Sequence, residues 1–502
     1  MSIAILRSRA QLGTDAPPVT IEVFLSGGLP GFSVVGMPET AVRESKDRVR
    51  GALLSSGFKF PLERIIVSLG PADMRKTGGR FDLAIALGIL AASKQLPGKV
   101  LDDFEFYGEL ALNGDLRRVP GILPAALKAE AAGRKVLVPR ENGREAALVS
   151  DHVFVADTLN DVSGFLRAAF VLESLPRTAP VPADAMRPDL ADVRGQSHAK
   201  RVLEVAAAGG HNLLMVGPPG TGKSMLAARL PGILPPMTQA EAIETAAIDS
   251  VLGLPVDLEH WCARPFRAPH HTASAPALVG GGSEPRPGEV SRAHNGVLFL
   301  DELPEFNRNV LEVLREPIEA GRITISRARR QDDFPAAFQL VAAMNPCPCG
   351  YLGDVMGNCG CSSEKVAAYR SRISGPLLDR IDLHVEVGRP PRELLRRGGE
   401  PGESSADVQQ RVIAARNRQL KRAAVCNARL QGDMLKSSCD LTKHGWQLLE
   451  DAADKFALSV RGYQRVLRVA RTIADLAEQE SISPGHVGEA LNLRGLNQAT
   501  IT

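Results

Sequence analysis

The stretch at residues 217–224 constrains the chain more than any other feature of its 502 residues. Its sequence, GPPGTGKS, follows an apolar run at 211–216 and precedes residues of helical composition. This order is typical of a phosphate-binding loop, because glycines let backbone N–H groups converge on an anion at a helix N-terminus. We expect Lys223 to reach the β- and γ-phosphates of ATP and the Ser224 hydroxyl to bind Mg²⁺. The loop residues predicted to bind nucleotide are Gly217, Pro218, Pro219, Gly220, Thr221, Gly222, Lys223 and Ser224.

A second apolar run, at residues 296–300, ends in the carboxylates Asp301 and Glu302. Nucleotide hydrolysis needs one carboxylate to hold Mg²⁺, here through water, and another to polarise the attacking water. We assign these roles to Asp301 and Glu302 in that order. Two acids after a strand are often only a solvated turn, but their position downstream of a phosphate-binding loop favours catalysis. A third apolar run, at 338–343, completes the pattern of a parallel α/β sheet.

The chain is too long for one core, and about three domains are expected. Residues 1–174 alternate short β-type runs with helical stretches, which predicts an α/β or α+β domain. A linker rich in Pro and Ala is expected at 175–188, and an ATPase core at 189–395. Residues 396–502 have helical composition, notably 406–429, and are predicted to form a helical lid domain.

Composition excludes several functional classes. The chain is 44% hydrophobic and 23% charged, as in ordinary globular proteins, and no apolar run is long enough to span a bilayer. We therefore expect a cytoplasmic protein without membrane contact. Aromatic residues make up only 4%, which argues against a platform of rings for stacking bases. Because the net charge is only +3, any nucleic-acid contact must come from a local basic patch.

Four of the seven cysteines lie close together, in the spacing Cys-x-Cys, nine residues, Cys-x-Cys. Four thiolates can close a tetrahedral Zn²⁺ site, although one-residue pairs depart from the commoner Cys-x-x-Cys spacing. The sequence is compatible both with a zinc site and with four free thiols. His270 and His271 have no matching ligand set nearby in the sequence, so we expect structural or subunit-interface roles for them. The clustered cysteines are Cys347, Cys349, Cys359 and Cys361.

Together the glycine loop and the paired carboxylates resemble the active site of AAA+ ATPases, over about residues 189–500. The resemblance implies that 192–196, with Val193 and Gly195, lines the adenine pocket. It also implies that Asn345 is the sensor-1 residue that orients water near the γ-phosphate; an Asn ending a strand can otherwise simply form a turn. Arg461 matches sensor 2 of the lid, and Arg465, one turn along the same helix face, is the alternative.

Arg380, in PLLDRIDLHVEV, matches the arginine finger of the magnesium-chelatase and MCM branch of AAA+ proteins. A finger supplied by the neighbouring subunit stabilises charge in the transition state. The alternative for Arg380 is a salt bridge to Asp379 or Asp382. Arg372 is a second candidate for contacting nucleotide or the neighbouring subunit.

Several longer stretches closely resemble the YifB/ComM family, which is often described as magnesium-chelatase-like. The stretches are 264–306, NPCPCG at 345–350, 372–386 and ARTIADL at 470–476. The resemblance implies a ring-forming ATPase, hexameric, that uses ATP and Mg²⁺. It also implies a DNA helicase that promotes branch migration while incoming DNA is integrated during natural transformation.

Two further segments point to a DNA contact. Residues 280–282 with Arg286 match the helix-two insert that this branch of AAA+ proteins aims into the pore of the ring. Residues 322–330 read as a basic hairpin between the Walker B strand and sensor 1, where related helicases place a presensor hairpin. Its arginines could neutralise phosphates without reading sequence. The alternative is a solvated hairpin whose charges prevent aggregation. The candidate DNA-binding residues are Arg327, Arg329 and Arg330.

The N-terminal residues resemble a Lon-protease-type domain, as in YGELALNGDLRRVPGILPAALKAEAAG. Active members of that family use a serine activated by a lysine. Here the stretch 76–81 contains no serine, Thr77 falls too early in the turn, and Leu123 lies near the position of the lysine. We therefore expect a non-catalytic domain that binds DNA, a partner or its neighbours in the ring.

Three functions remain open on the sequence. The first is a ring-forming DNA motor, and the second is a chelatase-like ATPase that remodels a protein partner. The third is a protein-unfolding or residual protease module, which the missing dyad disfavours. The basic hairpin and the family resemblance favour the DNA motor.

Overall fold

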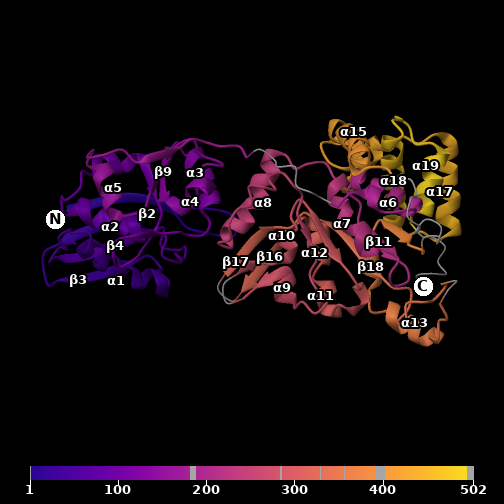
Figure 1. Ribbon diagram of the computed structural model, residues 1–502, viewed down its shortest axis with the longest axis horizontal. Coiled ribbons are helices and arrows are strands. Elements are labelled where there is room, and N and C mark those ends of the chain that lie inside the picture. The colour runs from indigo at the N-terminus through magenta and orange to yellow at the C-terminus, as the bar shows by residue number, and fades with distance from the viewer. Residues whose placement is uncertain are drawn as a thin grey trace. The chain divides into compact units, whose positions relative to one another are not determined.

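The computed structural model describes residues 2–180, 188–282, 285–327, 330–354, 357–389 and 402–494. Its contacts divide the chain into two compact units, each with its own sheet and hydrophobic core (Figure 1). The N-terminal unit comprises Met1–Ala183 and Gln239–Trp261, and the C-terminal unit comprises Asp184–Thr238 and Cys262–Thr502.

The N-terminal unit is built on a mixed sheet of eight strands. These are β1 (Ser2–Arg9), β2 (Pro18–Ser26), β3 (Gly31–Val35), β4 (Arg64–Gly70), β5 (Phe104–Phe106), β8 (Lys135–Pro139), β9 (Val153–Ala156) and β10 (Glu173–Leu175). They lie in the order β10-β9-β8-β5-β1-β2-β4-β3. The pairs β1–β2, β2–β4 and β9–β10 are antiparallel and the remaining pairs are parallel. A separate two-stranded ladder joins β6 (Glu109–Leu110) to β7 (Leu116–Arg117).

One apolar helix forms the centre of this unit. Every residue of α2 (Asp82–Ala92) except Ala91 is buried, since the helix is hydrophobic all round and packs against β1 and β2. Burial raises the pKa of the Asp82 carboxyl to about 7, while its ion pair with Arg48 opposes the shift. The other helices of the unit are α1 (Thr40–Ser55), α3 (Ile122–Ala131), α4 (Arg140–Ala146), α5 (Leu159–Leu166), α8 (Gln239–Val251) and the short 3₁₀ turn η1 (Lys99–Asp103).

The two stretches matched to the protease dyad meet in this unit, around a buried arginine. Arg80 donates from Nη1 to the carbonyl of Arg9, 3.3 Å away, and from Nη2 to the carbonyl of Gly121, also at 3.3 Å, and to that of Pro120. Burial lowers the pKa of the Arg80 guanidinium to about 10. Lys76 is buried as well, with Nζ bonded to the carbonyls of Pro71 and Met74. The cations at this position therefore hold backbone carbonyls, and they have no serine beside them in the stretch 76–81 to activate.

Helix α8 packs against α3 within the N-terminal unit, although the two helices are far apart in the sequence. The Gly121 N–H donates to the carbonyl of Ser250 at 2.7 Å, and the Leu123 N–H donates to its Oγ at 3.2 Å. The Ser250 hydroxyl in turn donates to the carboxylate of Glu145. A segment from the middle of the chain thus completes the N-terminal unit, which no pattern in the sequence indicated.

The C-terminal unit contains a five-stranded parallel sheet. Its strands are β11 (Leu213–Val216), β12 (Phe266–Arg267), β15 (Val297–Leu300), β18 (Gln339–Met344) and β19 (Leu383–Glu386). They lie in the order β12-β15-β18-β11-β19, and every pair is parallel. The strands β11, β15 and β18 contain only buried residues, as expected for a sheet covered on both faces.

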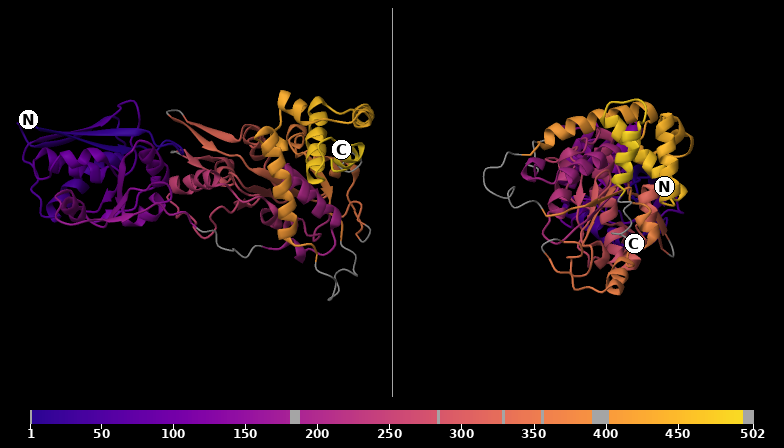
Figure 2. Two further views of the ribbon diagram at one scale, coloured as in Figure 1. Left: turned by 90° about the horizontal axis from the view of Figure 1, so that it is seen from above. Right: turned by 90° about the vertical axis from the view of Figure 1, so that its right-hand side faces the viewer.

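The helices of this unit cover the sheet and extend it with a C-terminal helical group. The orange and yellow helices of Figure 2 form that group, and they share one hydrophobic core with the sheet. The first set of helices is α6 (Ser197–Gly209), α7 (Lys223–Ile233), α9 (Ala275–Val279), α10 (Glu289–Arg292), α11 (Arg308–Glu312), α12 (Arg315–Ala320), α13 (Ser363–Arg370) and α14 (Gly375–Leu378). The C-terminal group is α15 (Ser405–Ala423), α16 (Gly432–Ser438), α17 (Lys443–Lys455), α18 (Val460–Leu476) and α19 (Pro484–Asn492). Short 3₁₀ turns are η2 (Leu190–Asp192), η3 (Leu303–Glu305) and η5 (Asn427–Arg429).

The structure confirms the predicted α/β class and all three predicted strands of the parallel sheet. It differs at two boundaries. The predicted linker at 175–188 starts inside β10, which ends at Leu175, and residues 181–187 lie outside the described part. The predicted helix at 406–429 ends at Ala423, because Ala424 adopts a positive φ of 56° before η5. Among the described residues, none of the helices combines the length and apolar character that a membrane span requires.

Replacing Arg80 tests its role in the N-terminal unit. Arg80→Ala leaves the buried carbonyls of Pro120 and Gly121 without their donor, and we expect a loss of about 1–3 kcal/mol in the free energy of unfolding. Scanning calorimetry of the full chain should show a lower melting temperature. Arg43→Ala removes an exposed arginine of the same unit and should leave the melting temperature unchanged. Equal melting temperatures for both variants would contradict the structural role of Arg80.

Candidate functional site

The order of the strands brings the predicted nucleotide-binding residues to one edge of the sheet. Strand β18 lies between β11 and β15, with Val216 opposite Met344 and Leu300 opposite Ala342. The residues that follow these parallel strands, Gly217, Asn345 and Asp301, therefore meet at the carboxyl edge. Ligands bind at this edge in open α/β sheets.

The loop after β11 has a backbone that only glycine adopts easily. Gly220 and Gly222 have φ values of 75° and 89°, and α7 begins directly after them with Lys223. At Gly217 an added Cβ would lie 2.2 Å from the carbonyl oxygen of Val387, so only glycine fits there. The loop consequently directs its N–H groups toward the start of α7, where the helix dipole favours an anion.

Lys223 lies in the middle of this loop with its ammonium group enclosed. Its Nζ donates to the carbonyls of Gly217 at 2.6 Å and Pro218 at 2.9 Å, and to Oδ1 of Asn345 at 3.2 Å. Burial lowers the pKa of Lys223, while the charges of Asp301 and Glu302 oppose the shift. The contact with Asn345 brings the predicted sensor-1 residue to the predicted phosphate ligand.

The two predicted magnesium ligands are in direct contact. Ser224 Oγ donates to Asp301 Oδ2 at 2.6 Å, and the other carboxylate oxygen of Asp301 accepts from the Glu302 N–H at 2.9 Å. Hydroxyl and carboxylate oxygens are the ligands that Mg²⁺ prefers. Glu302 itself has a positive φ of 52°, so the chain turns sharply after β15.

His271 contacts the predicted general base, which the sequence did not reveal. Its Nδ1 lies 3.2 Å from Oε2 of Glu302, and its ring stands edge-on to Phe306 with centroids 6.5 Å apart. His270 stacks on His271, with ring centroids 4.1 Å apart. From the sequence alone, both histidines are expected to have structural or subunit-interface roles. For His271 a position beside Glu302 is now the better interpretation, since β12 and β15 are adjacent in the sheet and His271 follows β12.

The candidate arginines differ in how accessible they are. Arg380 is buried, and its Nη2 lies 2.8 Å from Oε1 of Glu319 on α12. Its ion-pair partner is therefore Glu319 and not Asp379 or Asp382, the alternatives that the sequence offered. Arg372 is exposed beside Glu305, 3.0 Å away, in the turn after Glu302.

On the lid, Arg461 lies in the first turn of α18 with an exposed side chain. Arg465 is instead buried between β19 and α18, with Nε 3.4 Å from Asp382 Oδ1, and burial lowers its pKa. Of the two sensor-2 candidates, Arg461 is thus the one with an exposed side chain.

The segment predicted to line the adenine pocket closes one side of the site. Val193 is buried in the core, and Gly195 has a φ of 64°. The next residue, Gln196, donates from its amide to the carbonyl of Gly388 at 2.6 Å, and more weakly to that of Thr221 at 3.5 Å. This segment therefore links the phosphate-binding loop to the chain that leaves β19.

Two hairpins occupy the positions predicted for the inserts. The first pairs β13 (Gly280–Gly281) with β14 (Arg286–Pro287), and the second pairs β16 (Arg322–Arg327) with β17 (Arg330–Pro335). They touch, because a Cβ added at Gly280 would lie 2.6 Å from Cδ1 of Ile325. Of the predicted DNA contacts, Arg329 and the side chains of Arg327 and Arg330 lie outside the described residues.

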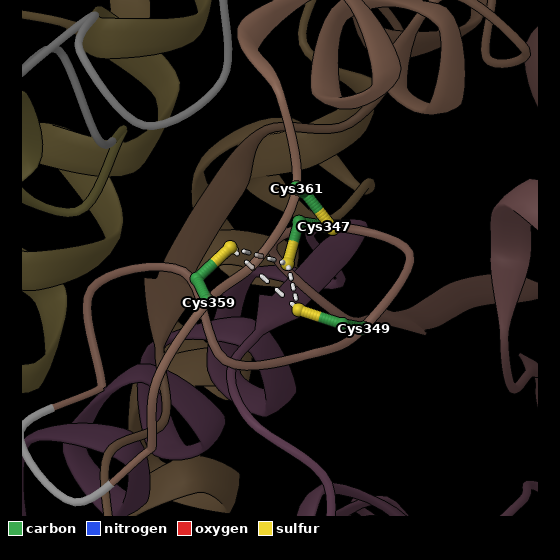
Figure 3. A group of neighbouring side chains, drawn as sticks. All are labelled: Cys347, Cys349, Cys359 and Cys361. Carbon is green, nitrogen blue, oxygen red and sulfur yellow. Dashed lines mark hydrogen bonds between the residues drawn. The ribbon is translucent and has the colours of Figure 1, made fainter.

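The four clustered cysteines converge between β18 and α13 (Figure 3). Their Sγ atoms all lie within 4.8 Å of one another, with 3.3 Å between Cys347 and Cys349, 3.7 Å between Cys347 and Cys359, and 3.6 Å between Cys349 and Cys359. Four sulfurs around zinc at about 2.3 Å are separated by about 3.8 Å. These distances are too long for disulfides and match a tetrahedral metal site.

Models of known families match nearly the whole chain. The family described as magnesium chelatase, subunit ChlI, matches residues 189–395, a second model of that subunit matches 21–142, and its C-terminal model matches 402–494. The chain is 50% identical to the protein YifB of Salmonella typhimurium, over 100% of this chain and 99% of that protein. It is 51% identical to the competence protein ComM of Haemophilus influenzae, over 99% and 98% of the two chains.

The chain belongs to the YifB/ComM family of magnesium-chelatase-like AAA+ proteins. A more distant relative is the 38 kDa subunit of magnesium chelatase from Cereibacter sphaeroides, 24% identical over 58% of this chain. Membership establishes an ATPase of the AAA+ class that uses ATP and Mg²⁺, and it indicates an oligomeric assembly. The contacts of Lys223, Ser224 and Asp301 agree with that chemistry.

Substitution of His271 tests whether this side chain positions Glu302. Losing the contact frees the carboxylate, and we expect His271→Ala to lower kcat about 10-fold or more, since small displacements of a catalytic group are costly. KM for ATP should change little, because the described contacts of His271, with Glu302, Phe306 and His270, do not include the phosphate-binding loop. His271→Asn keeps a hydrogen-bond donor and should recover much of kcat. Steady-state ATPase assays measure both constants. His270→Ala, the exposed neighbour, is the control, and an unchanged kcat in His271→Ala would refute the role.

Proposed function

We propose that the protein is a ring-forming ATPase motor that acts on DNA, a helicase that promotes branch migration while incoming DNA is integrated in natural transformation. The observation that carries the proposal is the pair of touching hairpins in the same unit as the phosphate-binding loop and the paired carboxylates. The 51% identity to a competence protein over nearly all of both chains supports the same use. The ring is expected to be a hexamer, as the family resemblance implies.

In the proposed site Lys223, Ser224, Asp301, Glu302 and Asn345 act on a nucleotide bound to their own subunit. Lys223 neutralises the β- and γ-phosphates, and Ser224 and Asp301 hold Mg²⁺. Glu302 accepts the proton of the attacking water, while Asn345 orients that water. Arg461 of the lid contacts the phosphates from the opposite side.

Arg380 is proposed to complete the site of the neighbouring subunit. In the single chain its guanidinium is paired with Glu319, whose side chain is 53% exposed. An exposed carboxylate is a weak partner, because water screens its charge. Exchanging Glu319 for a γ-phosphate across the subunit boundary is therefore inexpensive in free energy, and hydrolysis would report the presence of the neighbour.

The hairpins provide the proposed contact with DNA. Gly280 lets the first hairpin lie close against Ile325 of the second. The tip of the second carries Arg327, Arg329 and Arg330 in its sequence, and cations at a tip can follow a phosphate backbone without reading bases. Movement of both hairpins during the ATP cycle would push DNA through the ring.

Zinc is the third proposed cofactor, beside ATP and Mg²⁺. The Sγ distances of Cys347, Cys349 and Cys359 fit a tetrahedral thiolate site, and Cys361 supplies the fourth ligand.

The DNA motor is tested by ATPase rate and strand displacement on forked and branched DNA. We expect DNA to raise the ATPase rate and ATP to drive displacement. Replacing Arg327 and Arg329 by Glu should abolish the DNA response and leave the basal rate unchanged, because neither residue is assigned a role in ATP binding or hydrolysis. Glu302→Gln should bind ATP without turnover and displace no strand.

The same experiment separates the alternatives. ATP hydrolysis that is indifferent to DNA in the wild type would favour the chelatase-like remodelling of a protein partner. Normal turnover by Glu302→Gln would show that the general base is a different residue. Cleavage of casein would support the protease hypothesis, which the missing serine argues against.

The shared site predicts complementation between two inactive variants. Lys223→Ala cannot use its own nucleotide, and Arg380→Ala cannot stimulate its neighbour, so each alone should hydrolyse ATP at less than about a hundredth of the wild-type rate. Rings that contain both, purified through two different tags after co-expression, regain activity where an intact Lys223 site meets an intact Arg380. Mixed rings as inactive as either parent would show that Arg380 acts within its own subunit.

A further inference from the structure

The four-cysteine cluster is joined to the ATP site by the chain itself. Cys347 follows the sensor-1 residue Asn345 by two positions, at the end of β18. At the other end, Cys361 directly precedes Ser362, the N-cap of α13. A metal held by both cysteine pairs would therefore connect the end of β18 to the start of α13.

Helix α13 returns to the sensor-1 residue. Arg370, its last residue, donates from Nε and Nη2 to the carbonyl of Pro346, each at 3.3 Å. The neighbouring Tyr369 is buried with its hydroxyl against the backbone of Asn345. Burial, with the charge of Glu305 beside it, raises the pKa of Tyr369 to about 12, so the hydroxyl stays neutral. The loop thus starts and finishes at Asn345 and Pro346.

The loop also touches the phosphate-binding loop. Gly350 has a φ of 84°, and a Cβ added there would lie 2.7 Å from Cδ of Pro219. The same loop is tied to the chain after β19, where Arg389 lies 3.0 Å from Asp354 and over the ring of Tyr351. The described part of the loop therefore contacts residues on two sides of the nucleotide site.

We propose that the four cysteines bind one Zn²⁺ ion that fixes Asn345 and the loop at Gly350 in place against the phosphate-binding loop, so that ATP hydrolysis depends on zinc. A thiolate-bound zinc ion closes the loop and replaces the hydrophobic core that so short and glycine-rich a segment lacks. Without the ion, Gly350 and Asn345 lose the constraint that holds them near Pro219 and Lys223. Binding of ATP depends mainly on α7 and the glycines, whereas hydrolysis depends on the position of Asn345, so hydrolysis is the more sensitive of the two.

This inference rests on the proposed ATPase site but not on any action on DNA. Its first readout is the metal content of the full-length protein, measured by mass spectrometry after purification without added metal. We expect one zinc ion per chain in the wild type and almost none in the double variant Cys359→Ser/Cys361→Ser. Cys426→Ser, a half-buried cysteine outside the cluster, should keep its zinc.

The second readout compares binding with hydrolysis in the same proteins, without DNA. We expect the double variant to lose about 10-fold to 100-fold in kcat, the usual cost of displacing a positioning group, while its affinity for a fluorescent ATP analogue changes less than about 3-fold. Because the variant could also misfold, the wild type is treated with a mercurial that displaces zinc into a colorimetric chelator. Thiol and Zn²⁺ added afterwards should restore the rate.

Each outcome decides a separate point. Wild-type protein that contains no zinc and takes up none would overturn the metal site. A zinc-free double variant with wild-type kcat would overturn the dependence of hydrolysis on zinc, even if the metal site is real. Zinc-dependent ATP hydrolysis together with no response to DNA would leave this inference standing and remove the proposed DNA motor. Zinc-bound wild type that binds but never hydrolyses ATP would contradict both.

Discussion

Parallel pairing of β18 with β11 on one side and β15 on the other is the constraint on which the active site depends. Each of these strands is followed by a residue that the chemistry needs, and the register places the end of β11 opposite that of β18 and the end of β15 two residues before it. The direct result is the hydrogen bond from Lys223 Nζ to Asn345 Oδ1 and that from Ser224 Oγ to Asp301. Because the three strands are fully buried, a register slip would expose apolar side chains, and the site is held as firmly as the core.

The remaining functional segments are attached to the same edge. His271 follows the neighbouring strand β12 and reaches Glu302, and the cysteine loop follows β18 and returns through α13 to Asn345. Gln196, just before α6, donates to the carbonyl of Gly388 after β19, and the next residue, Arg389, pairs with Asp354 of the cysteine loop. A change in any of these segments can therefore alter hydrolysis without touching the phosphate-binding loop. This arrangement suits an oligomeric ATPase, in which signals from neighbouring subunits must reach one carboxylate and one water molecule.

Two buried cations lie in the N-terminal stretch that the sequence matched to the nucleophile of Lon-type proteases. Arg80 and Lys76 occupy the stretch where a protease of similar fold would place its nucleophile, and both are bonded to backbone carbonyls. Such cations stabilise the turn and leave no general base. The inclusion of α8 in this unit means that a segment between β11 and β12 of the ATPase sheet is part of the N-terminal core. The chain therefore passes between the N-terminal unit and the ATPase core at three points of the sequence.

The sequence by itself determined the phosphate-binding loop, the carboxylates Asp301 and Glu302 and the three central strands. These are local features, since each depends on a few adjacent residues and on their apolar or glycine-rich surroundings. The cysteine spacing likewise indicated a metal site but left free thiols open. Family resemblance added the roles of Arg380 and Arg461, which no local pattern could supply.

Only the tertiary structure decided which distant residues meet. It placed His271 beside Glu302, paired Arg380 with Glu319, and assigned Arg465 to Asp382, leaving Arg461 exposed. It also brought the four Sγ atoms together and set Gly350 against Pro219. These contacts follow from the order of the strands and the packing of the helices. Both are determined by the burial of apolar surface over the whole unit, and not by the identity of the polar residues that are brought into contact. A sequence read along the chain cannot show them, because the partners are separated by whole strands and helices.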